Sequence, residues 1–370
     1  MRIALFAQCM YSPWIEWIKN NSLLLSQELS QKIDVEIISH KPNELLEDAN
    51  LRGLKIHYLL RLSENKIIQF FYFIAWGLRS LFFIYWRGIK LICVQYIEIS
   101  FIMPMFFLTL CKRDTSFIVT IYSTDELEHR YKLLTLKLLR FKIKKIVIIS
   151  EYLRGALIDL WFKDADIEYI PLSYDKKRYL NFAKFKNRDK KLILFSAWPI
   201  KEAWSFFMVD LAKIMPDYNF IFAMRKFNKK SEDELGLLNE YIKKNWVKNI
   251  EIRRNIEKME VLLGEVWCLV LPLQDINVKM LIPVALLEAM ARWTICFVSD
   301  LPNLELLVED KVNAIVFKKN DLFALKKKID KFVIDETISE SAHKFWNLYP
   351  DYKNIWEKYF SLFEKIEWST

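Results

Sequence analysis

Short runs of β-branched residues alternate with helical stretches along the whole chain, and this alternation limits the possible folds more than any other feature of the sequence. It is typical of repeated strand–helix units on a parallel sheet, whose strands read as nearly continuous apolar runs because helices cover both faces. One charged run without apolar periodicity, AKFKNRDKK at 183–191, interrupts the pattern. The sequence therefore predicts an α/β protein made of two Rossmann-like, doubly wound parallel-sheet domains.

The predicted strands fall into two groups. Those before the charged run are 2–7, 35–39, 55–59, 91–97, 117–122, 145–150 and 167–171. Those after it are 192–197, 219–224, 250–254, 268–273, 294–299 and 313–317. We expect an N-terminal domain over 1–183, a C-terminal domain over 190–340, and helices over 341–370 that can pack back across the domain boundary. Two such domains in series predict a ligand-binding cleft between the carboxyl edges of their sheets.

The composition narrows the possible functions. The chain has six glycines and neither a GxGxxG nor a Walker sequence, which disfavours P-loop, kinase and simple dinucleotide-binding functions. The net charge of +9 favours anionic partners. The five cysteines lie mostly in apolar runs without CxxC spacing, which predicts buried thiols in a reducing compartment. The four histidines lie far apart in sequence, so no metal site is expected.

Two segments bear on membranes. The apolar run 67–86 is long enough to span a bilayer, but Gln69 and Arg79 interrupt it, which favours a buried or membrane-surface helix over a span. The segment 129–145 contains seven Lys or Arg and no acid, with leucines at helical spacing. This pattern predicts a basic amphipathic helix that rests on an anionic membrane, or alternatively an ordinary packing helix with a solvated lysine face.

Targeting and nucleic-acid signals are weak. The first apolar run, IALFA, is too short for a secretory signal and reads as a first buried strand. We therefore expect a cytoplasmic protein, peripheral at the inner face of the cell membrane if the basic helix docks there. Nucleic acid is not expected as a partner, because the aromatic residues lie in apolar runs and no known nucleic-acid motif is present.

A mostly apolar helix at 281–291 carries a single carboxylate, Glu288, and precedes a β-rich run and the sequence SDLP. This stretch, LLEAMA together with SDLPNLELLVEDKVNAIVFKKND through 321, resembles the donor-binding segment of GT-B glycosyltransferases of the family 4, or group 1, type. Three further stretches are similar to motifs of that family: IVIISEYLRGALID at 146–159, YIPLSYDKKRY at 169–179 and FSAWPIKEAW at 195–204. The second resembles the interdomain signature viPNGvD-x-x-x-F, with Asp175 at its Asp position.

The resemblance implies a retaining glycosyltransferase that uses a nucleotide-sugar donor as substrate and needs no cofactor or metal. Glu288 would accept hydrogen bonds from both ribose hydroxyls, a role suited to a carboxylate. Lys201 would neutralise the donor diphosphate, and the backbone around Ile282 and Pro283 leads to helix amides that can meet phosphate. The alternatives are a helix-favouring surface glutamate and a solvated lysine.

The sequence also departs from the family pattern. Met280 stands where the family usually has its first Glu, on the transferred sugar, and Arg225 is the nearest substitute for the missing arginine of the GRl motif. Tyr122 replaces the usual histidine after the fifth strand. Asp125 and Glu126 then become the candidate catalytic bases, or alternatively plain helix N-terminal carboxylates that the helix dipole favours.

The function that the resemblance implies is transfer of a sugar from a nucleotide-sugar to a membrane-associated glycan or lipid-linked acceptor. Two alternatives stay open at the level of the sequence. A GT-B-like protein with impaired catalysis would serve as a binding or scaffold partner. A protein that uses 67–86 as a true span would be anchored in the membrane.

Overall fold

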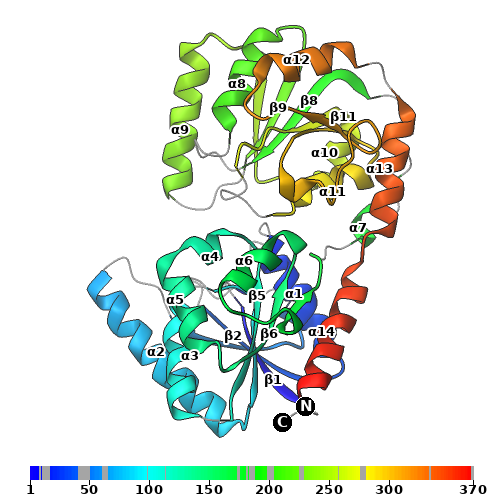
Figure 1. Ribbon diagram of the computed structural model, residues 1–370. Helices are drawn as coiled ribbons and strands as arrows, with labels where there is room; N and C mark the ends of the chain where they lie inside the picture. The colour runs from blue at the N-terminus through cyan, green and yellow to red at the C-terminus, as the bar shows by residue number, and fades with distance from the viewer. Residues whose placement is uncertain are drawn as a thin grey trace. The chain divides into compact units, whose positions relative to one another are not determined.

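The computed structural model describes residues 1–7, 10, 17–40, 51–60, 66–97, 99–112, 114–172, 176–180, 182, 188–197, 204–224, 229–256, 258–275, 281–332 and 335–367 (Figure 1). Its contacts divide the chain into two compact units. Unit 1 comprises Met1–Tyr174 and Pro350–Thr370, and unit 2 comprises Asp175–Tyr349.

Unit 1 is built on a seven-stranded sheet in the order β3-β2-β1-β4-β5-β6-β7. All neighbouring strands in it are parallel. The strands are β1 Arg2–Phe6, β2 Asp34–His40, β3 Lys55–Leu60, β4 Leu91–Val94, β5 Ser116–Ile121, β6 Ile143–Ile148 and β7 Ile167–Tyr169. The order reverses direction between β1 and β4, so the sheet is doubly wound.

Helices cover both faces of this sheet (Figure 1). They are α1 Trp17–Leu29, α2 Lys66–Trp86, α3 Ile99–Cys111, α4 Asp125–Glu128, α5 Arg130–Leu139, α6 Arg154–Asp159 and α14 Tyr352–Glu367. Successive strand residues point to opposite faces. On one face Leu5 belongs to the core under α1 and α14, together with Leu25 and Phe363. On the other face Phe6 packs against Phe101 of α3, with ring centroids 5.3 Å apart.

Unit 2 repeats the architecture with a six-stranded parallel sheet in the order β10-β9-β8-β11-β12-β13. The strands are β8 Asp189–Ala197, β9 Asn219–Met224, β10 Ile250–Arg254, β11 Val266–Leu271, β12 Ile295–Ser299 and β13 Ile315–Phe317. The edge strand β10 contains no fully buried residue, whereas every residue of β11 is buried. The central strands are therefore the continuous apolar runs that the sequence contains.

The helices of unit 2 are α7 Lys177–Leu180, α8 Ser205–Ile214, α9 Lys229–Lys244, α10 Met259–Glu265, α11 Val284–Ala291, α12 Leu322–Lys331 and α13 Glu336–Leu348. Two of them begin at aspartate caps. Asp321 accepts from the backbone N–H of Ala324 at 2.8 Å, and Asp335 accepts from that of Thr337 at 2.9 Å. Such caps satisfy N–H groups that the first turn of a helix cannot bond internally.

The predicted fold class, two Rossmann-like parallel-sheet domains, is confirmed, and each predicted strand overlaps an observed one. The contact boundaries differ from the expected 1–183, 190–340 and 341–370. Residues 176–180 group with unit 2 because Tyr179 bonds Glu288, and α13 groups with unit 2 because it packs on α11. Within the tail, the part that belongs to unit 1 is Pro350–Thr370. The cleft expected between two such domains stays a prediction.

Two local expectations change, and the expectation for the apolar run 67–86 stays a prediction. The helix expected over 129–145 ends at Leu139, and its last residues enter β6 instead. Cys93, Cys268 and Cys296 are buried as expected, but Cys111 is exposed at the end of α3. In the described residues one helical stretch, Ile68–Trp86, is long and apolar enough to cross a membrane. Only 22% of it is buried inside the protein, so it is not a core helix.

Candidate functional site

The second sheet reverses its direction of winding between β8 and β11, which pair in register from Cys268 opposite Ile193 to Val270 opposite Phe195. In doubly wound sheets ligands bind at the carboxyl ends of the strands that flank such a switch point. Here those ends are Ala197 and Leu271. The chain after β11 leads to the 281–283 loop and α11, so the fold places the start of α11 at the edge where a ligand is expected.

The loop before α11 is held by buried residues and a side-chain hydrogen bond, and the Pro283 side chain does not cap the start of the helix. Leu281 and Ile282 are buried, and the Asn303 side chain donates to the Leu281 carbonyl at 2.8 Å. Pro283 is the N-cap residue in extended conformation, with no capping bond from its side chain. The Leu286 N–H donates to the Pro283 carbonyl at 3.0 Å, but the Pro283 side chain caps neither of the first two N–H groups of α11, and such a helix start attracts anions.

Glu288 lies one turn further along α11, among buried neighbours such as Leu287 and Ala289. Its side chain is partly buried, and its Oε1 accepts a hydrogen bond of 2.7 Å from the Tyr179 hydroxyl. Tyr179 is buried on α7 and contacts Trp346 of α13 edge-on, with ring centroids 6.5 Å apart. The sequence-predicted carboxylate is therefore held in one orientation by a hydroxyl group that comes from a different part of unit 2.

The protonation state of this pair follows from its surroundings. Burial raises the pKa of Tyr179 well above its usual value, and the negative charge of Glu288 raises it further. The Tyr179 hydroxyl therefore stays protonated and donates to Glu288 near neutral pH. Arg178, the neighbour of Tyr179, pairs with Glu260 of α10 at 2.8 Å.

The other end of α11 is bonded closely to the rest of unit 2. Arg188 donates to the carbonyl groups of Arg292 and Trp293, the latter at 2.8 Å. His343 lies 3.1 Å from the Ala291 carbonyl and stacks on Trp293, with ring centroids 3.6 Å apart. Cationic donors at the last carbonyls of a helix also complement its dipole. The rigid C-terminal end of α11 fixes where Glu288 and the helix start lie.

Three of the predicted donor-site residues, Lys201, Met280 and Arg225, lie outside the described residues. Ile282, Pro283 and Glu288 are described: the first two directly precede α11, and Glu288 lies one turn into it.

The predicted catalytic residues of unit 1 lie after β5, next to the switch point between β1 and β4. Glu126 is fully buried and accepts backbone N–H bonds from Tyr122 at 2.6 Å, Ile97 at 3.1 Å and Ser123 at 3.3 Å. Burial raises the pKa of Glu126 to about 7, although these N–H bonds act to lower it. Its bonds join the loops that follow β4 and β5, which is the geometry of a positioning residue.

Tyr122 is also buried, and its hydroxyl donates to Gln95 at 2.8 Å and accepts from Asn21 at 3.1 Å. Burial raises the pKa of Tyr122 well above its usual value, so the hydroxyl stays protonated. Asp125 is the first residue of α4, and its side chain lies outside the described part of the structure.

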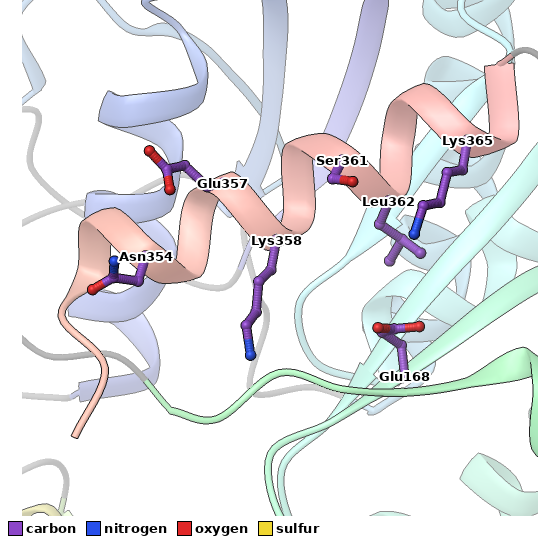
Figure 2. Close-up of a pocket in the computed structure, with 7 residues that line it drawn as sticks. All are labelled: Glu168, Asn354, Glu357, Lys358, Ser361, Leu362 and Lys365. Atoms are coloured by element: carbon purple, nitrogen blue, oxygen red, sulfur yellow. The ribbon is translucent and has the colours of Figure 1, made fainter. Parts of the chain in front are cut away.

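A surface pocket in unit 1 lies along α14 and contains none of the predicted site residues (Figure 2). Lys358 and Lys365 face it together with Glu168 and Glu357, so its charges balance and do not select an anion. Among the residues that the structure describes, no group of three or more His, Cys, Asp or Glu side chains is arranged to hold a metal ion.

Comparison with known families identifies the part of the chain that contains α11. Residues 213–347 match the family model of Glycosyl transferases group 1. Over this segment the chain resembles the group 1 glycosyltransferases, at the low similarity of a divergent sequence. No curated protein matches the sequence.

Solved structures extend the likeness over the whole chain. The Anabaena protein HepE in complex with UDP-glucose has a TM-score of 0.78 at 10% identity, with 99% of this chain and 100% of that chain covered. The sucrose-phosphate synthase of Thermosynechococcus elongatus has a TM-score of 0.76 at 13% identity, with both chains fully covered (100%). A glycosyltransferase from Rickettsia africae has a TM-score of 0.73 at 12% identity, with 99% and 98% covered. At these identities the likeness establishes the GT-B fold.

Tyr179, Gln95 and Asn21 were not among the residues predicted from the sequence. For Tyr179 a signal existed, because it stands at the aromatic position of the D-x-x-x-F motif in YIPLSYDKKRY. Neither Gln95 nor Asn21 has such a signal, since only the packing of α1 and the loop after β4 brings them to Tyr122.

Proposed function

We propose that this protein is a retaining glycosyltransferase that moves a sugar from a nucleotide-sugar donor to a membrane-associated glycan or lipid-linked acceptor, without a metal. The observation that carries the proposal is Glu288, a carboxylate oriented by Tyr179 inside the segment that matches the group 1 family model. The HepE structure that the chain resembles contains UDP-glucose, which makes a uridine donor the first to test.

In this proposal unit 2 binds the donor. Glu288 accepts hydrogen bonds from the two ribose hydroxyls, and charge-assisted bonds of this kind are strong. The diphosphate lies at the start of α11, where Pro283 leaves the first N–H groups uncapped, and Lys201 supplies the compensating positive charge. In the same proposal Arg225 is the second cation, the backbone of Ile282 leads to the helix amides that meet the phosphate, and Met280 takes the position beside the transferred sugar.

Unit 1 binds the acceptor in the same proposal. The acceptor hydroxyl oxygen forms the new bond to the anomeric carbon, the bond from that carbon to the diphosphate breaks, and the nucleoside diphosphate leaves with the electron pair. Asp125 or the departing diphosphate takes the hydroxyl proton, and positioning supplies much of the rate. We assign Glu126 and Tyr122 to holding the loops around this step, because both are buried and bonded.

Thermal unfolding with UDP, GDP, ADP and CMP sugars tests donor binding. A donor present at a hundredfold excess over its dissociation constant stabilises the folded state by about 2.7 kcal/mol. We expect Glu288→Ala to abolish this stabilisation, and Glu240→Ala, an exposed glutamate on α9 of the same unit, to preserve it. A flat response to every donor contradicts the proposal.

Turnover is tested separately with membrane extracts or defined polyprenyl-phosphate glycans as acceptors. We expect an unchanged anomeric configuration in the product by NMR and full activity in the presence of EDTA. Donor binding without transfer or hydrolysis identifies a binding or scaffold protein instead. An inverted product, or activity that EDTA removes, contradicts the corresponding part of the mechanism.

A further inference from the structure

Helix α2 exposes an apolar stripe from Ile68 to Trp86. Most of its exposed residues recur at spacings of three and four, which places them on one side of the helix. They include Ile68, Phe71, Tyr72, Ala75, Leu78, Arg79, Phe82, Tyr85 and Trp86. Phe82 is 72% exposed and Trp86 74%. A helix of a soluble protein normally turns such a stripe toward the core, so this helix has an outward face that water does not favour.

The opposite side of α2 is packed against the rest of unit 1. Trp76, Gly77, Ser80 and Ile84 are buried there. Gly77 allows a close approach to α3, because a Cβ atom at this position would lie 2.5 Å from the Phe107 ring. The apolar outer stripe is therefore not the result of a loosely placed helix. It also cannot be surrounded by lipid on all sides while its inner side packs in this way.

Helix α5 also has an exposed apolar side. Tyr131, Leu134, Leu138 and Phe141 are exposed at spacings of three and four along α5 and its end. Its other side buries Leu136 and Leu139 together with Thr135 and Lys132, and Lys132 donates to the Tyr96 hydroxyl at 3.0 Å. The basic helix therefore has apolar residues on both sides: Leu136 and Leu139 pack inward, and Leu134 and Leu138 face outward.

Helix α3 contacts both α2 and α5 (Figure 1). It adds two exposed apolar residues, Phe106 and Leu110. We call the exposed apolar residues of these three helices, with Phe141, the α2–α3–α5 face. It is much more extensive than the scattered apolar residues of an ordinary protein surface.

The charges of these helices have one sign. The sequences of α2, α3 and α5 contain Lys66, Arg79, Arg130, Lys132 and Lys137 and no Asp or Glu. Lys90, Arg140 and Lys144 are further exposed basic residues close to their ends. A second copy of this chain would oppose like charges across a two-fold interface, which disfavours self-association. Anionic lipid headgroups complement both the apolar and the basic character of the face.

We propose that the α2–α3–α5 face docks on the surface of an anionic lipid bilayer, with α2 lying in the headgroup region and not spanning the membrane. This placement buries the aromatic and leucine side chains in the interface while the basic side chains contact headgroups. The docking itself needs no donor. Its meaning for the acceptor rests on the proposed function, because a transferase held at this surface meets lipid-linked glycans.

Vesicle flotation of the full chain tests the docking. We expect binding to vesicles of phosphatidylcholine with phosphatidylglycerol, weak binding to phosphatidylcholine alone, and release in carbonate or high salt. The double variant Phe71→Ser and Phe82→Ser lowers the partition coefficient at least about tenfold. The matched control Trp246→Ser and Phe323→Ser removes two exposed aromatic residues of unit 2 and leaves binding unchanged.

A charge pair separates the electrostatic contribution. Arg130→Glu with Arg140→Glu weakens binding to the anionic vesicles by about tenfold or more, whereas Lys243→Glu with Lys244→Glu on α9 does not. The altered residues of all four variants are exposed, and circular dichroism with thermal unfolding verifies that each variant is folded.

The outcomes of these experiments are distinct. Failure of the wild-type chain to bind anionic vesicles, or equal binding by both aromatic double variants, overturns the docking proposal. If carbonate does not release the bound protein, a membrane span replaces the docking proposal. If the wild type forms dimers that the Phe71→Ser and Phe82→Ser variant does not form, self-association replaces it. Donor-induced thermal stabilisation is measured without vesicles, so it fails or succeeds independently of the docking.

Discussion

At the scale of single residues, the contact that decides the candidate donor site is the hydrogen bond from Tyr179 to Glu288. A partly buried carboxylate that loses its donor keeps a desolvation cost without compensation, typically about 1 to 3 kcal/mol. Tyr179 also fixes the side-chain orientation of Glu288 from outside α11. The pair therefore links the stability of unit 2 to the geometry of the proposed donor site.

We expect Tyr179→Phe to raise the KM for the nucleotide-sugar about tenfold, which corresponds to about 1.4 kcal/mol. The matched control is Tyr241→Phe, which removes a hydrogen bond of 2.9 Å from a tyrosine to the carboxylate of Asp210 elsewhere in unit 2. Both variants should lose some stability in urea unfolding, but only the first should change the KM. Equal KM values for the two variants contradict the role assigned to Tyr179.

Glu126 gives rise to a specific dependence of stability on pH. Burial raises its pKa from 4.5 in the unfolded chain to about 7, so between these values the folded chain binds the proton more tightly than the unfolded chain. The free energy of unfolding therefore falls as the pH rises from 4.5 to 7, by at most about 3 kcal/mol from this residue. Below pH 4.5 this penalty is absent, and above pH 7 it is complete.

His40 acts in the opposite direction, because burial lowers its pKa to about 4 and its stabilising effect is lost as the pH falls below 6.5. The free energy of unfolding in urea is therefore measured for the wild type and for Glu126→Gln, at about pH 5 and at about pH 8. The difference between the two proteins is taken at each pH, and the His40 contribution cancels in it. We expect the Gln variant to be the less stable protein at the lower pH, with a smaller deficit at the higher pH. A deficit that is the same at both pH values contradicts the raised pKa.

At the scale of elements, Gly77 determines how closely α2 packs on α3. An added Cβ atom would meet the Phe107 ring at 2.5 Å and the Met103 backbone at 3.2 Å. Overpacking of this kind costs about 1 to 3 kcal/mol, which exceeds the gain of about 1 kcal/mol from replacing a helical glycine. We expect Gly77→Ala to destabilise unit 1 in thermal unfolding.

Gly236 on α9 provides the control for this substitution, because no atom lies within 4 Å of the place that a Cβ atom would take there. Gly236→Ala should stabilise the protein by roughly 0.5 to 1 kcal/mol through helix propensity alone. If both alanine variants stabilise the protein, then α2 can move away from α3 at little cost, and its inner side does not hold it in place.

The elements were largely predictable, because apolar runs and their spacing determine strands and helices locally. The runs at 117–122 and 294–299 are strands as expected. The direction of a helix face was not predictable for 129–145, where leucine spacing alone does not say that Leu134 and Leu138 face outward. The same limit applies to the site: Glu288 was found from its apolar context, but its bond to Tyr179 depends on tertiary packing.

At the scale of the whole molecule, the chain completes its first unit with its last helix. Helix α14 places Ile355, Trp356, Tyr359 and Phe363 in the core under β1 and α1, more than 340 residues after that strand in sequence. The Tyr359 hydroxyl bonds Thr120 of β5 at 2.9 Å. Unit 1 is therefore discontinuous in sequence, while unit 2 is a single continuous segment.

We expect truncation after Tyr349 to unfold unit 1 and to leave unit 2 folded. Each large apolar side chain of α14 stabilises the fold by roughly 1.5 to 3 kcal/mol when buried. The loss of several of them is therefore as large as the whole free energy of unfolding of a typical domain. Hydrogen exchange with mass spectrometry measures this directly: peptides from β1, β4 and β5 should lose protection, and those from β8, β9 and β11 should keep it.

Tyr359→Ala should reproduce part of the loss at about 3 kcal/mol or more, whereas Lys358→Ala, exposed on the same helix, should have no effect. Protection that survives truncation in the strands of unit 1 would mean that α14 covers a core already complete without it.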